Sequence, residues 1–111
     1  MAKVEITERV LEAIEIAKAT GKIKKGTNEV TKVIERGQAK LVVYAKDANP
    51  PELVMHIPIL AKEKGVPAVA VNSKEELGAA AGLSVSTVSV AIVEEGDAKA
   101  LVKDIAREAK A

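Results

Sequence analysis

Three short apolar segments, at residues 41–45, 67–71 and 89–93, set the pattern of this sequence. The first, Leu41-Val42-Val43-Tyr44-Ala45, is apolar at every position. Such a run is typical of a strand covered on both faces, because an exposed face would require polar residues at alternate positions. The sequence therefore predicts a sheet that lies between two layers of helices.

Amphipathic patterns between these segments predict the covering helices. We expect helices at residues 7–20, 27–37, 49–65 and 73–82, and a last one that starts at residue 97. A short basic segment, 22–25, supplies a fourth strand. Residues 1–111 are thus predicted to form a single α/β domain, a three-layer α/β/α sandwich with a four-stranded mixed sheet.

Local signals mark the helix ends. The expected N-caps are Thr7, Thr27, Ser73 and Asp97, and Ser73 forms a capping box with Glu76. The expected stops are Gly21, Gly37, Gly65 and Gly82. Pro58 is expected to kink or restart the third helix, because proline lacks the amide that continues the hydrogen-bond ladder.

Composition excludes several classes of protein. The chain has no Cys, one His and a single aromatic residue, Tyr44. The absence of Cys rules out disulfides and thiolate metal sites, and the scarcity of aromatics argues against base stacking on aromatic platforms. No apolar stretch approaches the roughly 20 residues that cross a bilayer. We expect a cytoplasmic protein without a metal, a cofactor or a membrane partner.

Basic residues concentrate in one part of the chain. Residues 18–46 hold eight basic and two acidic side chains, a local charge of +6 in a protein whose net charge is +1. We call these eight basic residues the basic belt: Lys18, Lys22, Lys24, Lys25, Lys32, Arg36, Lys40 and Lys46. Such a belt indicates contact with a polyanion, although a solvated surface of flexible lysines is an equal alternative at this point.

The run Gly26-Thr27-Asn28-Glu29-Val30-Thr31-Lys32 lies within this belt. Asn28, Glu29 and Lys32 can project from one side of a helix start, where free amides bind phosphate. A carboxylate would repel phosphate, but it can accept from the N1–H and N2–H₂ groups of an exposed guanine edge. A capped helix with a Glu29–Lys32 surface pair, worth about 0.3 kcal/mol, explains the run equally well.

The sequence resembles the archaeal ribosomal protein L7Ae family and its kink-turn-binding relatives of small nucleolar and spliceosomal particles. The resemblance covers nearly the whole chain and is carried by the motifs Gly26–Lys32, Arg36-Gly37, Pro50-Pro51-Glu52, His56-Ile57-Pro58, Gly65-Val66-Pro67, Ser73-Lys74, Glu76-Leu77-Gly78, Ala81-Gly82 and Ser89-Val90-Ala91-Ile92. It implies an α/β/α sandwich that binds RNA bends beside tandem sheared G·A pairs.

The resemblance also implies roles for particular residues. Asn28, Glu29 and Lys32 would contact the G·A guanines, at the helix start formed by Gly26 and Thr27. A second patch would hold the extruded nucleotide, with Asn49, Leu53, Lys74, Leu83, Ser84 and Val85. Lys25, Arg36 and Lys40 would contact or steer phosphates. The chain would be monomeric when free, and would bind ribosomal RNA and guide RNAs together with other ribonucleoprotein proteins.

Two departures from the family and two alternatives remain. Ser84 stands where archaeal members often have Glu, and Gln38 stands where Ile is frequent, so a paralogue that serves as another ribosomal or protein-interaction module is an alternative. A small α/β enzyme would need a nucleophile–base pair, and the sequence offers none. His56 has no nearby Cys or second His, which favours a structural histidine with a hydrogen-bond partner.

Overall fold

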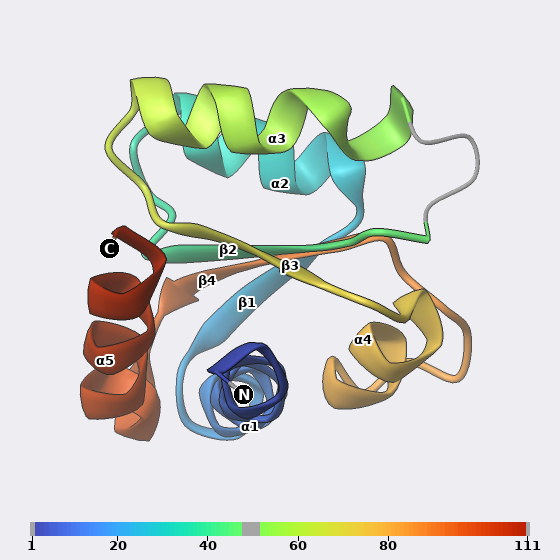
Figure 1. Ribbon diagram of the computed structural model, residues 1–111, viewed down its shortest axis with the longest axis vertical. Helices are drawn as coiled ribbons and strands as arrows, with labels where there is room; N and C mark the ends of the chain where they lie inside the picture. Colours follow the sequence, from blue (N-terminus) through green and yellow to red (C-terminus); the bar gives the residue numbers. More distant parts are fainter. Residues whose placement is uncertain (1, 48–51, 111) are drawn as a thin grey trace.

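A four-stranded mixed sheet lies at the centre of the computed structural model (Figure 1), which describes residues 2–47 and 52–110, and the side chains of residues 8–47 and 55–107. The strands are β1 (Lys22–Lys25), β2 (Leu41–Ala45), β3 (Ala68–Val71) and β4 (Ser89–Glu94), in the order β1-β4-β2-β3. β4 runs antiparallel to both β1 and β2, whereas β2 and β3 are parallel. The predicted mixed sheet is confirmed.

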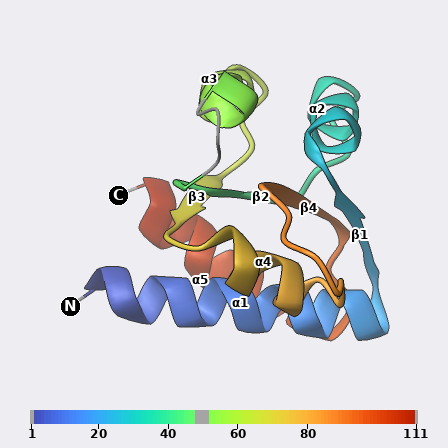
Figure 2. The ribbon, with the colours of Figure 1, turned by 90° about the vertical axis from the view of Figure 1, so that its right-hand side faces the viewer.

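Helices cover both faces of this sheet. They are α1 (Ala2–Thr20), α2 (Thr27–Glu35), α3 (Glu52–Glu63), α4 (Lys74–Ala80) and α5 (Lys99–Lys110), with a short 3-10 helix, η1 (Gly96–Ala98), before α5. Figures 1 and 2 show α2 and α3 on one face and α1, α4 and α5 on the other. The three-layer sandwich predicted from the sequence is therefore confirmed.

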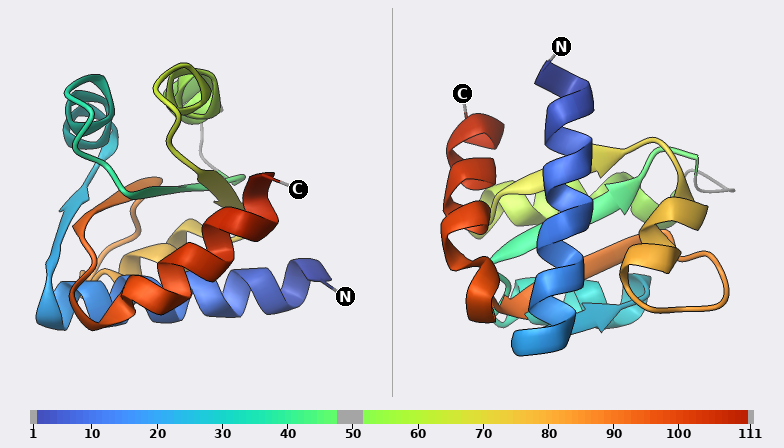
Figure 3. Two further views of the ribbon diagram at one scale, coloured as in Figure 1. Left: turned by 90° about the vertical axis from the view of Figure 1, so that its left-hand side faces the viewer. Right: turned by 90° about the horizontal axis from the view of Figure 1, so that it is seen from below.

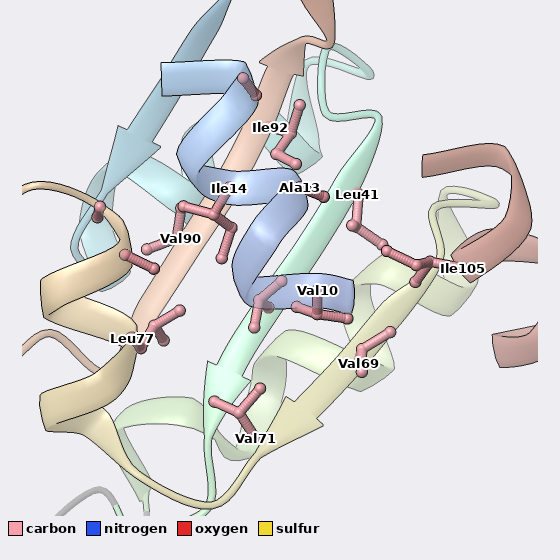
Figure 4. Close-up of a cluster of buried hydrophobic side chains, with 14 of the residues drawn as sticks. Val10, Ala13, Ile14, Leu41, Val69, Val71, Leu77, Val90, Ile92 and Ile105 are labelled. Atoms are coloured by element: carbon pink, nitrogen blue, oxygen red, sulfur yellow. The ribbon is translucent and has the colours of Figure 1, made fainter. Parts of the chain in front are cut away.

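Alternate residues of β2 pack into two separate cores, as a doubly covered strand requires. Leu41 and Val43 belong to the core beneath α1, α4 and α5, together with Val10 and Ile14 of α1 (Figure 4). Val42 belongs to the opposite core, which it shares with residues of α2 and α3. Five consecutive apolar residues are needed because both faces of the strand are buried.

Three of the four predicted N-caps are wrong, and each differs for a physical reason. α1 begins at Ala2, so Thr7 lies inside it; Ala and Lys in the preceding residues favour helix extension. Gly26, not Thr27, is the N-cap of α2, and no side chain caps this end. Asp97 lies within η1, where its amide donates to Thr20 Oγ1 at 2.9 Å, and α5 begins at Lys99.

Among the remaining local signals, the cap at Ser73 and three of the glycine stops are confirmed, whereas a restart at Pro58 is not. Ser73 caps α4, and its hydroxyl accepts from the Glu76 amide at 3.2 Å, which confirms the predicted cap and this half of the capping box. Pro58 does not restart α3, which runs through it from Glu52 to Glu63. Gly37, Gly65 and Gly82 follow the ends of α2, α3 and α4 with φ angles of 71°, 71° and 79°, a conformation that stops a helix at little cost only for glycine.

Among the described residues, no helix is both long enough and apolar enough to cross a membrane.

Candidate RNA interface

The start of α2 is fixed to the sheet through its N-cap, Gly26. The Gly26 amide donates to the Ser89 carbonyl oxygen at 3.1 Å, and the Gly26 carbonyl accepts from the Val30 amide at 2.9 Å. Gly26 has a φ of 93°, and no heavy atom lies within 4 Å of the position a Cβ would take. The backbone conformation, rather than crowding, therefore requires glycine at this point.

The first turn of α2 presents its polar groups to solvent. Asn28, Glu29 and Lys32 are exposed, whereas Val30 and Val33 are buried, which is the division expected from the sequence. Among the described residues, no group accepts from the amides of residues 27–29, and no ion pair joins Glu29 to Lys32. The capped helix with a surface pair, which the sequence allowed, is thus not what the structure contains.

A second cluster forms where α4 begins. The Lys74 amide donates to Asp47 Oδ1 at 2.8 Å, so the first residue of α4 is attached to the chain just after β2. Lys74 itself is half-buried. The loop of residues 82–88 leads from α4 to β4, and a Cβ on Gly78 would lie only 2.3 Å from the Val85 carbonyl oxygen. The loop therefore packs directly on α4.

The residues of the predicted second patch differ in how exposed they are to solvent. Val85 is 68% exposed and Ser84 is also exposed, but Leu83 is half-buried and packs against the core. Asn49 lies outside the described residues. Leu53 lies in α3, but its side chain is outside the described part of the chain. Of the predicted patch, Lys74 is the first residue of α4, and residues 83–85 lie in the loop that packs on α4.

The two clusters meet at one edge of the sheet (Figure 2). Lys25 pairs with Val90 and Tyr44 with Ser89, so β1 and β2 end where β4 begins. Because β3 is parallel to β2, it ends at the same edge. The segments that follow β1, β2 and β3, and the loop that precedes β4, are therefore neighbours. These four segments are far apart in the sequence, and the strand order brings them together.

The basic belt does not all lie at this edge. Its eight members are exposed, and Lys25, Lys32 and Lys46 lie near the start of α2 or just after β2. Arg36 is the C-cap of α2, and Lys40 precedes β2 at the opposite edge, where its amide donates to the Ile92 carbonyl. The nine residues of α2 separate these two positions from the helix start by about 13 Å.

Ion pairs neutralise little of the positive charge of the basic belt. Lys22 Nζ lies 3.6 Å from Glu94 Oε2 on the neighbouring strand, and both side chains are largely exposed. Such surface pairs contribute little to stability. Within the described residues, no group of His, Asp and Glu side chains could hold a metal ion.

Several residues of this region were not identified from the sequence. Asp47, Thr87 and Ser89 connect the segments of the interface through hydrogen bonds, and neither Asp47 nor Thr87 belongs to a recognisable motif. His56 Nε2 lies 2.9 Å from Thr31 Oγ1, which confirms the predicted structural histidine and links α3 to α2. Most of these contacts join residues that are distant in the sequence, so no local pattern indicates them.

Comparison with known proteins identifies a family and a similar solved structure. A model of the ribosomal protein L7Ae/L30e/S12e/Gadd45 family matches residues 8–102. The fold is similar to the solved structure of a 15.5kD RNA binding protein of Giardia lamblia, with a TM-score of 0.91 and 35% sequence identity over 96% of this chain and 88% of that one. Both clusters described above fall within the residues that the family model matches.

Proposed function

We propose that this chain, which belongs to the L7Ae/L30e/S12e/Gadd45 family and is an RNA-binding protein of that family, recognises kink-turn and kink-loop RNA through tandem sheared G·A pairs. The observation that carries the proposal is the exposed Glu29 carboxylate, unpaired among the described residues, inside a belt of positive charge. A phosphate-binding surface gains nothing from this carboxylate, whereas a guanine edge offers two donors to it.

The first turn of α2 supplies each group that this recognition needs. Glu29 accepts from guanine N1–H and N2–H₂, Lys32 donates to O6, and Asn28 both donates and accepts. The free amides of residues 27–29 add donors at the positive end of the helix dipole, where phosphate or a base oxygen is favoured. The positively charged side chains around them increase the rate of encounter with RNA.

The second cluster holds the nucleotide extruded at the bend. Val85 offers exposed apolar surface, Lys74 offers a positive group, and exposed Ser84 offers a hydroxyl next to Val85 in the chain. Asn49 and Leu53 complete this patch in the proposal. Lys25 contacts phosphate beside the α2 start, and Arg36 and Lys40 steer the backbone at the far end of that helix.

Binding stabilises the bent RNA because the protein contacts the guanines and the extruded nucleotide together only in that state. This is a shift of population toward the kinked form. We propose that the folded RNA then serves as a platform for other proteins in the large ribosomal subunit and in box C/D and H/ACA guide-RNA particles, and that ribonuclease P is a further candidate. A binding role of this kind, without catalysis, fits the family.

A gel-shift comparison tests the proposal. One RNA carries an intact kink-turn, and the other has its G·A pairs replaced by Watson–Crick pairs in the same stem. We expect tight binding to the first alone at moderate salt. Equal binding to both would remove the proposal, and would leave a general phosphate contact by the basic belt as the function of this surface.

A further inference from the structure

A hydrogen-bond network joins the two clusters of the interface. Thr87 is 8% exposed, and its hydroxyl donates to the Ser89 carbonyl oxygen at 3.2 Å. The Gly26 amide donates to the same oxygen at 3.1 Å. One buried carbonyl therefore holds both the loop that precedes β4 and the start of α2, with a donor for each of its two lone pairs.

The network continues from Thr87 to α4. The Thr87 amide donates to the Lys74 carbonyl at 3.2 Å, and the Lys74 amide donates to Asp47 Oδ1 at 2.8 Å. A continuous path thus runs from Asp47 after β2, through the start of α4 and the loop, to the N-cap of α2. The start of α2, the start of α4 and the loop of residues 82–88 are all attached to it.

The Thr87 hydroxyl has a particular place in this path. The other bond to Ser89 O comes from a backbone amide, which no side-chain substitution removes. If the Thr87 hydroxyl is lost, Gly26 keeps its partner and the start of α2 stays in position. Thr87 lies only two residues before Ser89, so what is lost is the hydrogen bond that fixes the backbone conformation of the loop where it enters β4, while the Thr87 amide keeps its bond to the Lys74 carbonyl. The separation between residues 83–85 and the guanine-reading turn is then less well defined.

We infer that Thr87 is a positioning residue that fixes the spacing between the two halves of the RNA site. The inference rests on the proposed function, because a folded RNA presents its guanines and its extruded nucleotide at one spacing. Both halves contribute fully only when the protein holds the same spacing in advance, since a loosely held group loses binding energy to ordering.

Two substitutions at this position provide the test. Thr87→Val removes the hydroxyl and keeps the β-branched shape, whereas Thr87→Ser keeps the hydroxyl. Dissociation constants are measured by fluorescence anisotropy for three RNAs: an intact kink-turn, the same RNA with an abasic site at the extruded nucleotide, and the same RNA without G·A pairs. Thr20→Val is the control, because it also removes a threonine hydroxyl that is bonded to the backbone, at the Ile16 carbonyl and the Asp97 amide, beyond the other end of β1.

We expect Thr87→Val to weaken binding to the intact kink-turn by about fivefold, as for the loss of roughly one hydrogen bond. Binding to the abasic RNA should be unchanged, because that RNA no longer uses the loop. Thr87→Ser should restore the wild-type preference, and Thr20→Val should lower the melting temperature without changing the ratio of the two affinities.

The inference is overturned by equal weakening on the intact and abasic RNAs, by no weakening on either, or by a wild-type protein that does not prefer the intact RNA to the abasic one. Those results leave the proposed function in place if the RNA without G·A pairs still binds poorly. Equal wild-type binding to the intact RNA and to the RNA without G·A pairs would instead remove the proposed function, and this inference with it.

Discussion

At the scale of single residues, Glu29 separates guanine recognition from general attraction to RNA. Its carboxylate is exposed on the first turn of α2. We expect Glu29→Ala to weaken kink-turn binding by tenfold or more, since a good base-edge contact contributes about 1–3 kcal/mol. Binding to RNA without G·A pairs should stay the same or improve, because a negative charge is removed. Gel-shift titration of both RNAs measures this loss of discrimination.

The control for that experiment lies on the same helix. Glu35 is also exposed, but it is the last residue of α2 and faces the far edge of the site. Glu35→Ala removes the same charge and should leave discrimination intact. Full discrimination by Glu29→Ala would show that the carboxylate does not read guanine.

The Ser89 side chain gives a prediction about stability. Its hydroxyl is buried and has no hydrogen-bond partner among the described residues, although its backbone carbonyl serves two donors. A buried polar group without a partner costs about 1–3 kcal/mol. We expect Ser89→Ala to keep the free energy of unfolding unchanged or to raise it by about 1 kcal/mol, as measured by urea denaturation. Exposed Ser86→Ala is the control, and a clear loss of stability in Ser89→Ala would contradict the argument.

At the scale of elements, the sequence predicted what local pattern decides. The apolar run 41–45 predicted a doubly covered strand, and Ser73 with Glu76 predicted a real cap, because both signals are complete within a few residues. The start of α2 at Thr27 was predicted correctly, but its N-cap is Gly26 and not Thr27. The conformation of this N-cap depends on the hydrogen bond from the Gly26 amide to the Ser89 carbonyl, and Ser89 lies far from Gly26 in the sequence.

The candidate site also contains residues that the sequence could identify and residues that it could not. Asn28, Glu29 and Lys32 share a helical turn, so spacing alone placed them on one exposed side. Thr87 and Asp47 could not be found, because their roles follow from the strand order that brings four segments to one edge. The exposure of Leu83 was overestimated, since its packing against the core depends on the close approach of its loop to α4.

Gly26 connects the geometry of α2 to binding. Its φ of 93° is unfavourable for any residue with a Cβ, although the space around it is open. We expect Gly26→Ala to lower the free energy of unfolding by about 1–2 kcal/mol and to weaken kink-turn binding, because the turn that presents Asn28 and Glu29 shifts. Gly65→Ala is the matched control: its φ is 71°, its surroundings are open, and it follows α3 away from the site. Equal effects of the two variants on RNA affinity would show that the shape of the α2 start is unimportant.

At the scale of the whole molecule, positive charge is unevenly distributed along the chain. The basic belt carries most of the positive charge, and residues outside the segment 18–46 sum to −5. On the opposite face of the sheet from α2, α1 presents exposed Glu8, Glu12 and Glu15 and lies beside α5 (Figure 3). The positive charge that attracts RNA from a distance is therefore concentrated in the segment 18–46.

Lys40 tests this long-range contribution, because it lies at the opposite edge of the sheet from the α2 start. A residue that contacts or steers phosphate there attracts every RNA equally. We expect Lys40→Ala to weaken binding to kink-turn RNA and to RNA without G·A pairs by the same factor, and to lower the slope of log affinity against log salt by about one. Lys103→Ala, at an exposed position on α5, should change neither value. If Lys40→Ala weakened kink-turn binding alone, Lys40 would be part of base recognition, and the guanine-reading surface would have to extend along the whole length of α2.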